Sequence, residues 1–496
     1  MNAMAAASTE IFEFPCSFAQ QRLWIDDRLS PGSPFYNIHA SIRVPSLLDP
    51  APLRSALLAL VERHETLRTT FVERDGAPMQ RVATAIDCDF AAEDLRALAV
   101  PTREQRVIEL AQAQAAQPFD LERGPLLRLR LLRTGVAECV LMLTVHHIVA
   151  DAWSMGVLLR EITALYVAAA SAQPAALPVL AIQYADYAVW QRQSSNSAGD
   201  DATLAYWRQH LAGLTTLELP TDRPRPPVAT HRGRTLHFAF DDALSQTLLD
   251  VAQHYSVTPY VVLVSALAVV LQRNCGQDEV VVGAPVAGRD RPELEGLIGF
   301  FVNTLVLRLD LAGEPAFATL ARRVQQVLQA ALSHQALPFE RLVEELHCAR
   351  DLSRNPLFQV SVQYLAAPGV AGAVQATAAS VLEVQRGATN FDLSFDFWLA
   401  AGRLEGRVDY ALDLFDGSTV ERWVGQLRRL LGQALAEPEV SIESLDLLAP
   451  DERARLLGSW AGERRTIGTT AACRRCWLRW YAGSPGPSRC AAPASN

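Results

Sequence analysis

The stretch VLMLTVHHIVADAWSM, residues 140–155, places two adjacent histidines and an aspartate between two kinds of secondary structure. Its first six residues form an unbroken apolar run, which predicts a central, buried β-strand. After the histidines, apolar residues recur at helical spacing, namely Trp153, Val157, Leu158, Ile162, Leu165 and Tyr166. The histidines and the aspartate are therefore expected on a strand-to-helix turn, and such loops commonly carry function.

The residues on either side of this turn predict further alternation of helices and strands. Asp49 is expected to cap a helix whose apolar face is Leu53, Leu57, Leu60 and Val61. Residues 126–133 (LLRLRLLR) alternate, which predicts a strand with one face exposed to water. Later elements are expected as strands at 235–240, 279–286 and 301–309, and as a buried helix from Pro259 to Leu271 capped by Thr258. The pattern indicates an α/β fold.

The composition of two segments predicts that they lack regular secondary structure. Residues 191–203 (QRQSSNSAGDDAT) are polar, and residues 220–233 (PTDRPRPPVATHRG) are rich in proline and arginine. Together they indicate connections between two lobes.

Bulk composition narrows the class of protein. A chain of 496 residues suggests two or three domains, and 50% hydrophobic residues are ample for globular folding. A net charge of −9 without a basic block argues against a nucleic-acid partner. The first residues do not resemble a signal peptide, and no apolar run reaches the roughly 20 residues that span a bilayer. Eight scattered cysteines suggest a reducing cytoplasm, with no membrane partner.

Composition changes after Trp460. The tail contains Cys473, Cys476 and Cys490 with several arginines and almost no acidic residue. A zinc site with four ligands lacks a member there, so residues 461–496 are expected to be a disordered end, produced by truncation or a change of reading frame.

The two histidines offer a metal, a catalytic and a structural interpretation. Neighbouring side chains on a strand point to opposite faces, so His146 and His147 cannot easily share one ion, and no further histidine cluster completes a metal site. A structural histidine at a strand end remains open from the motif alone. In the catalytic interpretation, an imidazole takes a proton from a nucleophile or orients it, while Asp151 fixes the loop by pairing with an arginine.

The catalytic interpretation also predicts the reaction type. Backbone amides at the start of the following helix are expected to help to hold an oxyanion. No G-x-S-x-G elbow is present, so direct transfer between two bound substrates fits better than a covalent acyl-enzyme.

Seven segments in order resemble the core motifs of nonribosomal peptide synthetase condensation domains. HHIVADAWS is similar to the H-H-x-x-x-D-G motif of that family. The other six are SFAQQRLW (17–24), RHETLRTTF (63–71), YADYAVW (184–190), IGFFVNTLVLR (298–308), HQALPFERL (334–342) and RDLSRNPLFQV (350–360). A single H-x-x-x-D is a weak signal, whereas seven ordered motifs are specific.

The resemblance implies a fold and an activity. The family has two chloramphenicol acetyltransferase-like lobes that form a V with a central tunnel, expected here at residues 10–180 and 181–450, with residues 451–496 as linker and tail. Donor and acceptor arrive on the phosphopantetheine arms of carrier domains, and the acceptor amine attacks the donor thioester to form an amide. The chain itself is expected to bind no cofactor or metal, to be monomeric and to meet carriers on other proteins.

The resemblance also implies residue roles. His147 matches the active-site histidine, which positions or deprotonates the amine, while His146 and Asp151 are expected to be structural. Arg289 is the candidate partner of Asp151, and Trp153 and Ser154 belong to the same motif. Arg68 lies either near the site or in a charged helix end, and Asn303 is expected at the junction of the lobes. Ala152 replaces the usual glycine; its methyl group would be strained at positive φ and is expected to alter substrate fit.

Three functional classes remain. The first is an elongation enzyme that joins two carrier-bound groups in nonribosomal peptide or lipopeptide biosynthesis. The second is a starter domain that N-acylates the first amino acid from acyl-coenzyme A, which the early first motif slightly favours. The third is a non-catalytic carrier-recruitment module. Heterocyclising and epimerising relatives are disfavoured by the histidines at 146 and 147 and by the elongation-like later motifs.

Overall fold

The computed structural model describes residues 11–194, 198–348, 351–365, 380–382 and 387–458. The expected disordered tail, with its three cysteines, lies outside these residues. The described residues up to Leu445 form one compact unit, and those from Asp446 onward belong to a second. In the second unit the described residues contain helix α14 (Pro450–Leu457).

A five-stranded sheet carries the histidine motif. Its order is β12-β2-β7-β6-β5, and only β5 and β6 pair in parallel. The strands are β2 (Asn37–Val44), β5 (Asp89–Asp94), β6 (Leu127–Arg133), β7 (Cys139–His146) and β12 (Ser380–Leu382). Every residue of β7 is buried, which confirms the predicted central strand.

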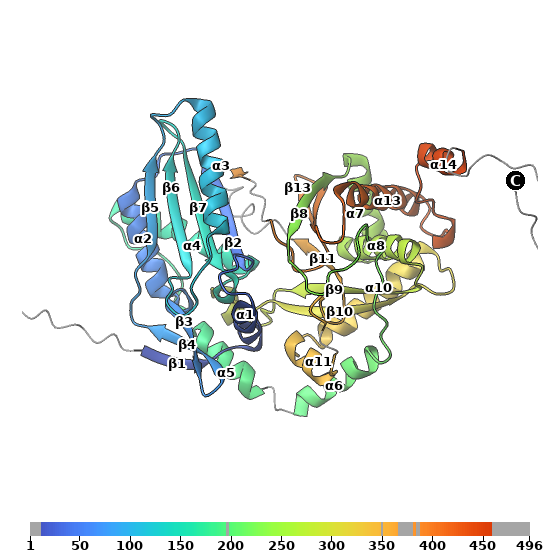
Figure 1. The fold of residues 1–496 in the computed structure, drawn as a ribbon, viewed down its shortest axis with the longest axis horizontal. Helices are drawn as coiled ribbons and strands as arrows, with labels where there is room; N and C mark the ends of the chain where they lie inside the picture. Colours follow the sequence, from blue (N-terminus) through green and yellow to red (C-terminus); the bar gives the residue numbers. More distant parts are fainter. Residues whose placement is uncertain (1–10, 195–197, 349–350, 366–379, 383–386, 459–496) are drawn as a thin grey trace, which may run out of the picture. The chain divides into compact units, whose positions relative to one another are not determined.

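Helices cover both faces of this sheet (Figure 1). On one face, Leu141, Leu143 and Val145 share a core with α2 (Pro50–Arg63) and α4 (Ala152–Ser171). On the other, Val140 and Met142 pack against α3 (Val100–Ala116). The prediction that β6 has a water-exposed face is therefore wrong, because α3 and the chain that follows it cover that face. Arg128 on β6 is buried, donates to the carbonyls of Gln117 and Pro118, and lies over the Phe119 ring.

A six-stranded sheet is built from the second half of the chain. Its order is β10-β9-β11-β13-β14-β8, with β11 parallel to both neighbours. The strands are β8 (Gly233–Ala239), β9 (Glu279–Val286), β10 (Asn303–Asp310), β11 (Val360–Leu365), β13 (Leu393–Ala400) and β14 (Arg403–Ala411). The predicted strands at 235–240, 279–286 and 301–309 correspond to β8, β9 and β10.

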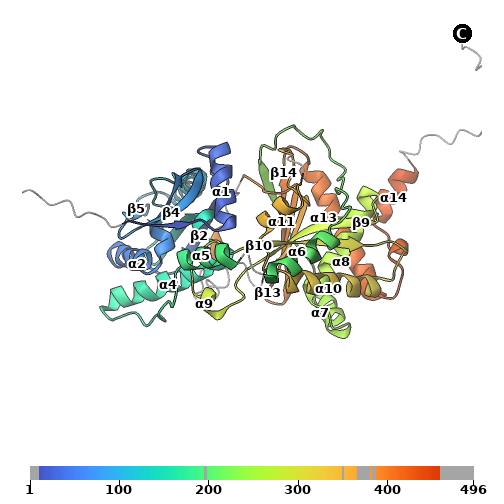
Figure 2. The ribbon, with the colours of Figure 1, turned by 90° about the horizontal axis from the view of Figure 1, so that it is seen from below.

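Helix α8 (Pro259–Cys275) is the buried helix of the second half. Thr258 caps it by accepting a hydrogen bond from the Val261 amide at 3.3 Å, and its residues 261–272 are buried, as predicted. Three helices contact it, α7 (Asp242–His254), α10 (Phe317–Ser333) and α13 (Gly417–Ala436) (Figures 1 and 2). The predicted helix after Asp49 is also confirmed, because Asp49 caps α2.

A three-stranded sheet of order β1-β4-β3 and several short elements complete the described fold. They are β1 (Ile11–Pro15), β3 (Thr69–Arg74), β4 (Ala77–Ala83), α1 (Phe18–Leu29), α5 (Tyr184–Ser194), α6 (Ala198–His210), α9 (Pro292–Glu295), α11 (Phe339–Glu345) and the 3₁₀ turns η1 (Glu65–Arg68), η2 (His147–Val149) and η3 (Ile442–Ser444).

The two predicted irregular segments differ in outcome. All described residues of 191–203 are helical, in α5 and α6, so the first prediction is wrong there. The physical reason is an anchor: Trp207 on α6 is buried and its indole nitrogen donates to the His334 carbonyl at 3.0 Å. Residues 220–232 are irregular as predicted, and ion pairs fasten them, including Arg225 with Asp392 and Arg232 with Asp413.

Two contacts bear on how the halves of the chain are joined. Strand β12 comes from the second half yet pairs with β2 of the first. Helix α5, which follows residue 180, is hydrogen-bonded to the start of the chain, because Arg192 donates to the Cys16 carbonyl at 2.8 Å. The division into lobes at residue 180 stays a prediction.

Within the described residues, no single helix is long and apolar enough to cross a membrane; the bent pair α7 and α8 passes that test only by length and composition.

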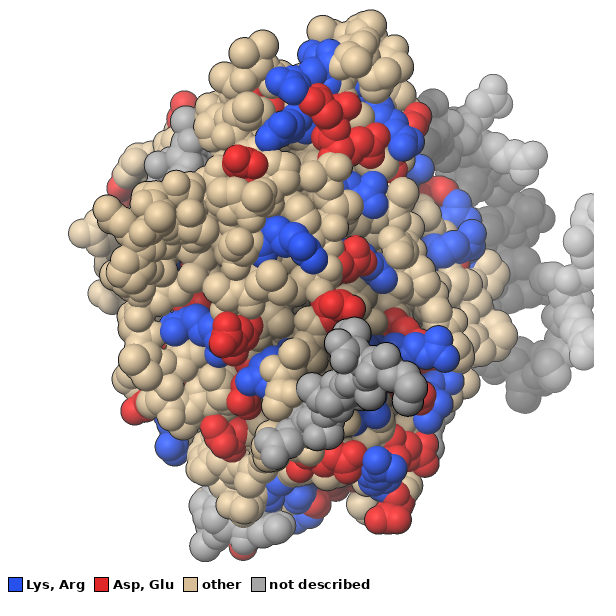
Figure 3. Space-filling view, turned by 90° about the vertical axis from the view of Figure 1, so that its left-hand side faces the viewer, with Lys and Arg blue, Asp and Glu red and all other residues tan. Residues whose placement is uncertain are grey.

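On the face shown in Figure 3, basic and acidic side chains are interspersed.

Candidate active site

The histidine motif begins where β7 ends. His146 is the last residue of β7, η2 follows at His147, and α4 begins at Ala152. Asp151 is the N-cap of α4 and accepts from the Ser154 amide at 2.7 Å. The predicted strand-to-helix turn is thus confirmed, and it sets the two histidines in different environments.

His146 is a buried structural residue in this geometry, only 3% exposed. Its Nδ1 accepts from the Ile148 amide at 3.1 Å, and its ring meets Tyr36 and Phe119 edge to face. Burial, with a smaller effect of His147, lowers the pKa of His146 to about 3. The imidazole is therefore neutral at physiological pH, because the low-dielectric surroundings disfavour its charged form.

His147 is only partly buried and is held at two points. Its amide donates to the Tyr36 carbonyl at 2.8 Å, and its Nδ1 lies 2.8 Å from the Ala150 carbonyl. Because a carbonyl can only accept, Nδ1 carries a proton and the neutral ring has its lone pair on Nε2. The Phe300 ring packs edge to face against the imidazole, with centroids 4.7 Å apart. The imidazole is thus held through its Nδ1 on one side and by the Phe300 ring on the other.

The Asp151 side chain forms a buried ion pair with Arg289. Its Oδ2 accepts from Arg289 Nη1 at 2.8 Å and from the Phe301 amide at 3.1 Å. The two charged side chains are 0% and 1% exposed. Arg289 also lies over the Phe301 ring at 4.1 Å. The pair fixes the turn that follows His147 to residues far away in the sequence.

Ser154 and Trp153 extend the same contact region. Ser154 Oγ accepts from Arg289 Nη2 at 2.9 Å and donates to the Gly299 carbonyl at 2.8 Å. The Trp153 indole donates to the Glu295 carbonyl at 2.9 Å. Trp153 is 47% exposed, so it does not join the buried stripe of α4 that its spacing predicts.

Ala152 is the exposed first residue of α4 and has a helical backbone. The positive φ that would strain an alanine is therefore not required here. Two amides near the helix start have partners inside the turn: the Ser154 amide donates to Asp151 Oδ1 and the Met155 amide to the Asp151 carbonyl. The expected help of the helix-start amides in holding an oxyanion therefore stays a prediction, and it falls on the amides of Ala152 and Trp153, the first two residues of α4.

Arg68 and Asn303 have local partners. Arg68 donates to the Ala83 carbonyl and, at 3.1 Å, to Glu65, which fits a charged helix end rather than a reactive group. The Asn303 amide nitrogen donates to the carbonyls of Gln335 and Leu337, both at 2.8 Å. Its Oδ1 accepts from the Phe339 amide at 2.9 Å. Asn303 thereby holds the HQALPFERL segment in place.

Sequence reasoning missed two residues beside His147, namely Tyr36 and Phe300. Phe300 lies inside the IGFFVN segment, so the motif singled out this stretch of chain but did not indicate that the Phe300 ring packs against His147. Tyr36 acts through its backbone carbonyl, for which the side-chain pattern gives no signal.

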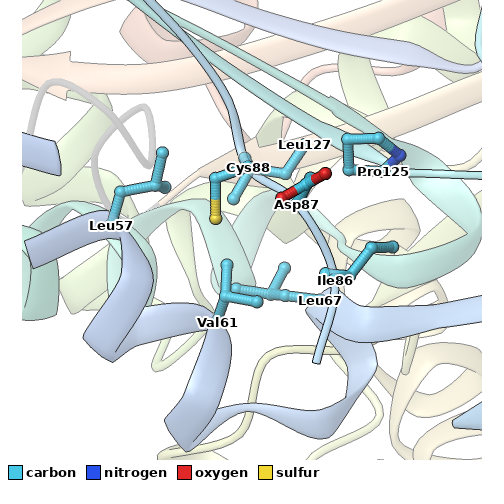
Figure 4. Close-up of a pocket in the computed structure, with 8 residues that line it drawn as sticks. All are labelled: Leu57, Val61, Leu67, Ile86, Asp87, Cys88, Pro125 and Leu127. Atoms are coloured by element: carbon cyan, nitrogen blue, oxygen red, sulfur yellow. The ribbon is translucent and has the colours of Figure 1, made fainter. Parts of the chain in front are cut away.

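The described residues show no candidate metal centre. They contain no group of three or more His, Cys, Asp or Glu side chains that could hold a metal ion. One apolar hollow lies between α2 and the chain before β5, lined by Leu57, Val61, Leu67, Ile86, Asp87, Cys88, Pro125 and Leu127 (Figure 4). It has no room for a water-sized sphere, so it is a packing gap.

Comparison with known proteins places this geometry in a family. A family model described as "Condensation domain" matches residues 11–457. One protein of the linear gramicidin synthase of Brevibacillus parabrevis is 42% identical over 449 residues, which are 90% of this chain but 9% of that protein.

Solved structures agree with this match. The X-domain from teicoplanin biosynthesis is 30% identical, with a TM-score of 0.78, over 88% of this chain and 97% of that one. The four-domain nonribosomal peptide synthetase holo-AB3403, bound to AMP and glycine, is 26% identical, with a TM-score of 0.79, over 91% of this chain and 35% of that one. The predicted α/β fold of the chloramphenicol acetyltransferase type is confirmed. The chain belongs to the condensation-domain family of nonribosomal peptide synthetases.

Proposed function

We propose that this chain forms an amide bond between a donor thioester and the amine of an aminoacyl acceptor carried on a partner carrier domain. Condensation domains catalyse this class of reaction. The chain matches a segment amounting to 9% of a gramicidin synthase protein, and one part of a four-domain synthetase. Both matches fit a domain that acts on substrates delivered by its neighbours.

The observation that carries the proposal is the hydrogen bond between His147 Nδ1 and the Ala150 carbonyl. With Nδ1 bound to the Ala150 carbonyl at 2.8 Å, Nε2 is the basic nitrogen of the neutral ring. In the reaction, the acceptor nitrogen attacks the thioester carbonyl and gives a proton to Nε2. The carbon–sulfur bond then breaks, and the leaving thiolate takes up this proton from Nε2. A base near neutral pH suits this transfer, and no covalent acyl-enzyme is needed.

The buried pair of Asp151 and Arg289 supports this role indirectly. It fastens the turn after His147 to the loop before β10 and keeps that turn rigid. Rigid support of this kind preserves the alignment on which a positioned base depends. We further propose that the chain binds no cofactor of its own and receives both substrates on phosphopantetheine or, for the donor, on coenzyme A.

The test uses the purified full chain with an aminoacyl-loaded carrier as acceptor. Donors are a second loaded carrier and a panel of acyl-coenzyme A thioesters of different chain lengths, and the carrier-bound product is weighed by mass spectrometry. Amide formation that His147→Ala lowers by at least about 100-fold and His254→Ala leaves intact would establish the function, since His254 is an exposed histidine on α7.

The donor that reacts decides the subtype. Condensation of two loaded carriers assigns the chain to elongation, and N-acylation from acyl-coenzyme A assigns it to starter domains. Carrier binding without a product from any donor would contradict the proposal and indicate a recruitment module.

A further inference from the structure

A buried chain of hydrogen bonds joins three segments around the histidine loop. Its central residues, Ser17, Gln20 and Tyr184, are 0%, 0% and 1% exposed. Ser17 and Gln20 form a capping box at the start of α1, in which Ser17 Oγ accepts from the Gln20 amide at 3.1 Å and Gln20 Oε1 accepts from the Ser17 amide at 3.0 Å. The box therefore presents a fixed serine hydroxyl toward α5.

The Tyr184 hydroxyl connects this box to a distant loop. It lies 2.7 Å from the Phe300 carbonyl and 3.0 Å from Ser17 Oγ. Burial raises the pKa of Tyr184 well above its ordinary value, so the phenol keeps its proton. Since a carbonyl can only accept, that proton belongs to the bond with Phe300, and the Ser17 hydroxyl donates to the Tyr184 oxygen. Each bond in such a directed chain polarises the next.

The two ends of the chain reach the neighbours of His147. Gln20 Nε2 donates to the carbonyl of Ile148, the next residue after His147, at 3.2 Å. At the other end is Phe300, whose ring packs against the His147 imidazole at 4.7 Å between centroids. One network thus restrains both the backbone that carries the imidazole and the ring that packs against it.

The contact between Tyr184 and the Phe300 loop leaves little freedom. A Cβ added to Gly299 would lie 2.0 Å from Tyr184 Cδ2, so only a glycine allows the tyrosine ring to approach this backbone. The ring also packs edge to face on Phe301 at 4.9 Å. The Tyr184 hydroxyl is therefore the polar group that fixes the position of the Phe300 carbonyl, while the close-packed Tyr184 ring leaves this backbone little room to move.

We propose that Tyr184 is a positioning residue for His147. By fixing the Phe300 carbonyl, it holds the Phe300 ring against the imidazole and keeps His147 in the orientation that bonds Ala150. The catalytic consequence rests on the proposed function, whereas the effect on the imidazole itself does not.

The first test needs no substrate. The full chain is prepared with ¹⁵N-histidine, and the His147 nitrogens are assigned by their loss in His147→Gln. Tyr184→Phe should shift the His147 tautomer equilibrium away from Nδ1–H. The matched control is Tyr187→Phe, which removes a hydroxyl from the same helix at a residue 9% exposed, where the partner is Gln191. Equal His147 spectra in the two variants would overturn the proposal.

The second test measures amide formation with the loaded-carrier substrates above. Tyr184→Phe should lower kcat about tenfold with KM within about twofold, as expected for lost alignment rather than lost binding. In a Phe300→Ala background the same substitution should leave kcat nearly unchanged, because the ring through which it acts is gone. Independent, multiplying effects would contradict the proposal.

Two outcomes keep the inferences separate. A wild-type chain that makes no amide contradicts the proposed function, while the nitrogen spectra still decide the role of Tyr184. If Tyr184→Phe does not fold, Ser17→Ala replaces it: it removes the proton donated to the Tyr184 oxygen, and it should shift the His147 spectrum in the same direction by a smaller amount. An unchanged His147 spectrum in folded Ser17→Ala would contradict the proposal that the hydrogen-bond chain through Tyr184 positions His147.

Discussion

Asp151 and Arg289 form an ion pair in which neither side chain reaches solvent, with 2.8 Å between Oδ2 and Nη1. Two charges withdrawn from water are tolerated only when their remaining polar atoms are satisfied. Asp151 meets this condition through the amides of Ser154 and Phe301 in addition to the guanidinium. Arg289 meets it in part: Nη2 donates to Ser154 Oγ and to the Leu297 carbonyl, while its buried Nε has no hydrogen-bond partner. The pair therefore acts as a rigid joint between the start of α4 and the loop before β10.

Removing one partner of this joint should destabilise the protein strongly. Asp151→Ala leaves the Arg289 charge buried and unpaired, which costs about 3–5 kcal/mol. We expect a lower melting temperature than for His147→Ala, measured by calorimetry. Arg291→Ala, which removes an exposed arginine two residues from Arg289, is the control and should change the melting temperature little. Equal melting temperatures for Asp151→Ala and His147→Ala would remove the structural assignment.

The two adjacent histidines should respond differently to substitution. His147→Ala should lower the rate of amide formation by ~10²–10⁴-fold, the range for a lost general base, with folding retained because the side chain is partly exposed. His146→Ala should instead lower the melting temperature, since it leaves the Ile148 amide without its acceptor. Near-native turnover by His147→Ala would show that the base or positioning role is wrong.

The buried His146 also predicts a pH dependence of stability. Its pKa is lowered from 6.5 to about 3 in the folded chain, so the unfolded state binds the proton more readily. The stabilising effect of the neutral ring is complete above pH 6.5 and is lost as the pH falls toward 3. Between pH 7 and pH 5 the unfolding free energy should fall by about 2 kcal/mol from this group. Denaturant unfolding of His146→Asn, which keeps an acceptor for Ile148, should lack this component; an unchanged slope would contradict it.

Ala152→Gly should have a small effect. The residue is exposed and its backbone is helical, so restoring the glycine relieves no strain. We expect a loss of at most about 1 kcal/mol, the difference between alanine and glycine in a helix, and steady-state constants for amide formation within about threefold. A large gain in kcat would show that the methyl group limits substrate fit.

Residues 461–496 should be dispensable. They lack apolar periodicity and lie beyond Leu457, where the match to the condensation-domain family ends. A chain shortened after Trp460 should keep its melting temperature and its rate of amide formation. A clear loss of either would show that the tail contacts the folded part.

The sequence by itself determined the elements whose signals are local. An unbroken apolar run predicted β7 and helical spacing predicted α4, while the caps Asp49 and Thr258 marked helix starts, because capping and burial patterns act within a few residues of chain. The same local signals placed His147 on a strand-to-helix turn. The local pattern correctly gave β6 as a strand but was wrong about its water-exposed face, which α3 covers, and it was wrong for residues 191–203, where the anchor at Trp207 overrides it.

Only the tertiary structure decided which atoms meet at the site. Arg289 lies 138 residues from Asp151, and the Phe300 ring that packs against His147 comes from the same distant loop. Family resemblance suggested the arginine, but no local pattern could give the hydrogen bond of His147 to the Tyr36 carbonyl or that of Tyr184 to the Phe300 carbonyl. Backbone acceptors carry no side-chain identity, so their pairing depends on where the folded chain places them.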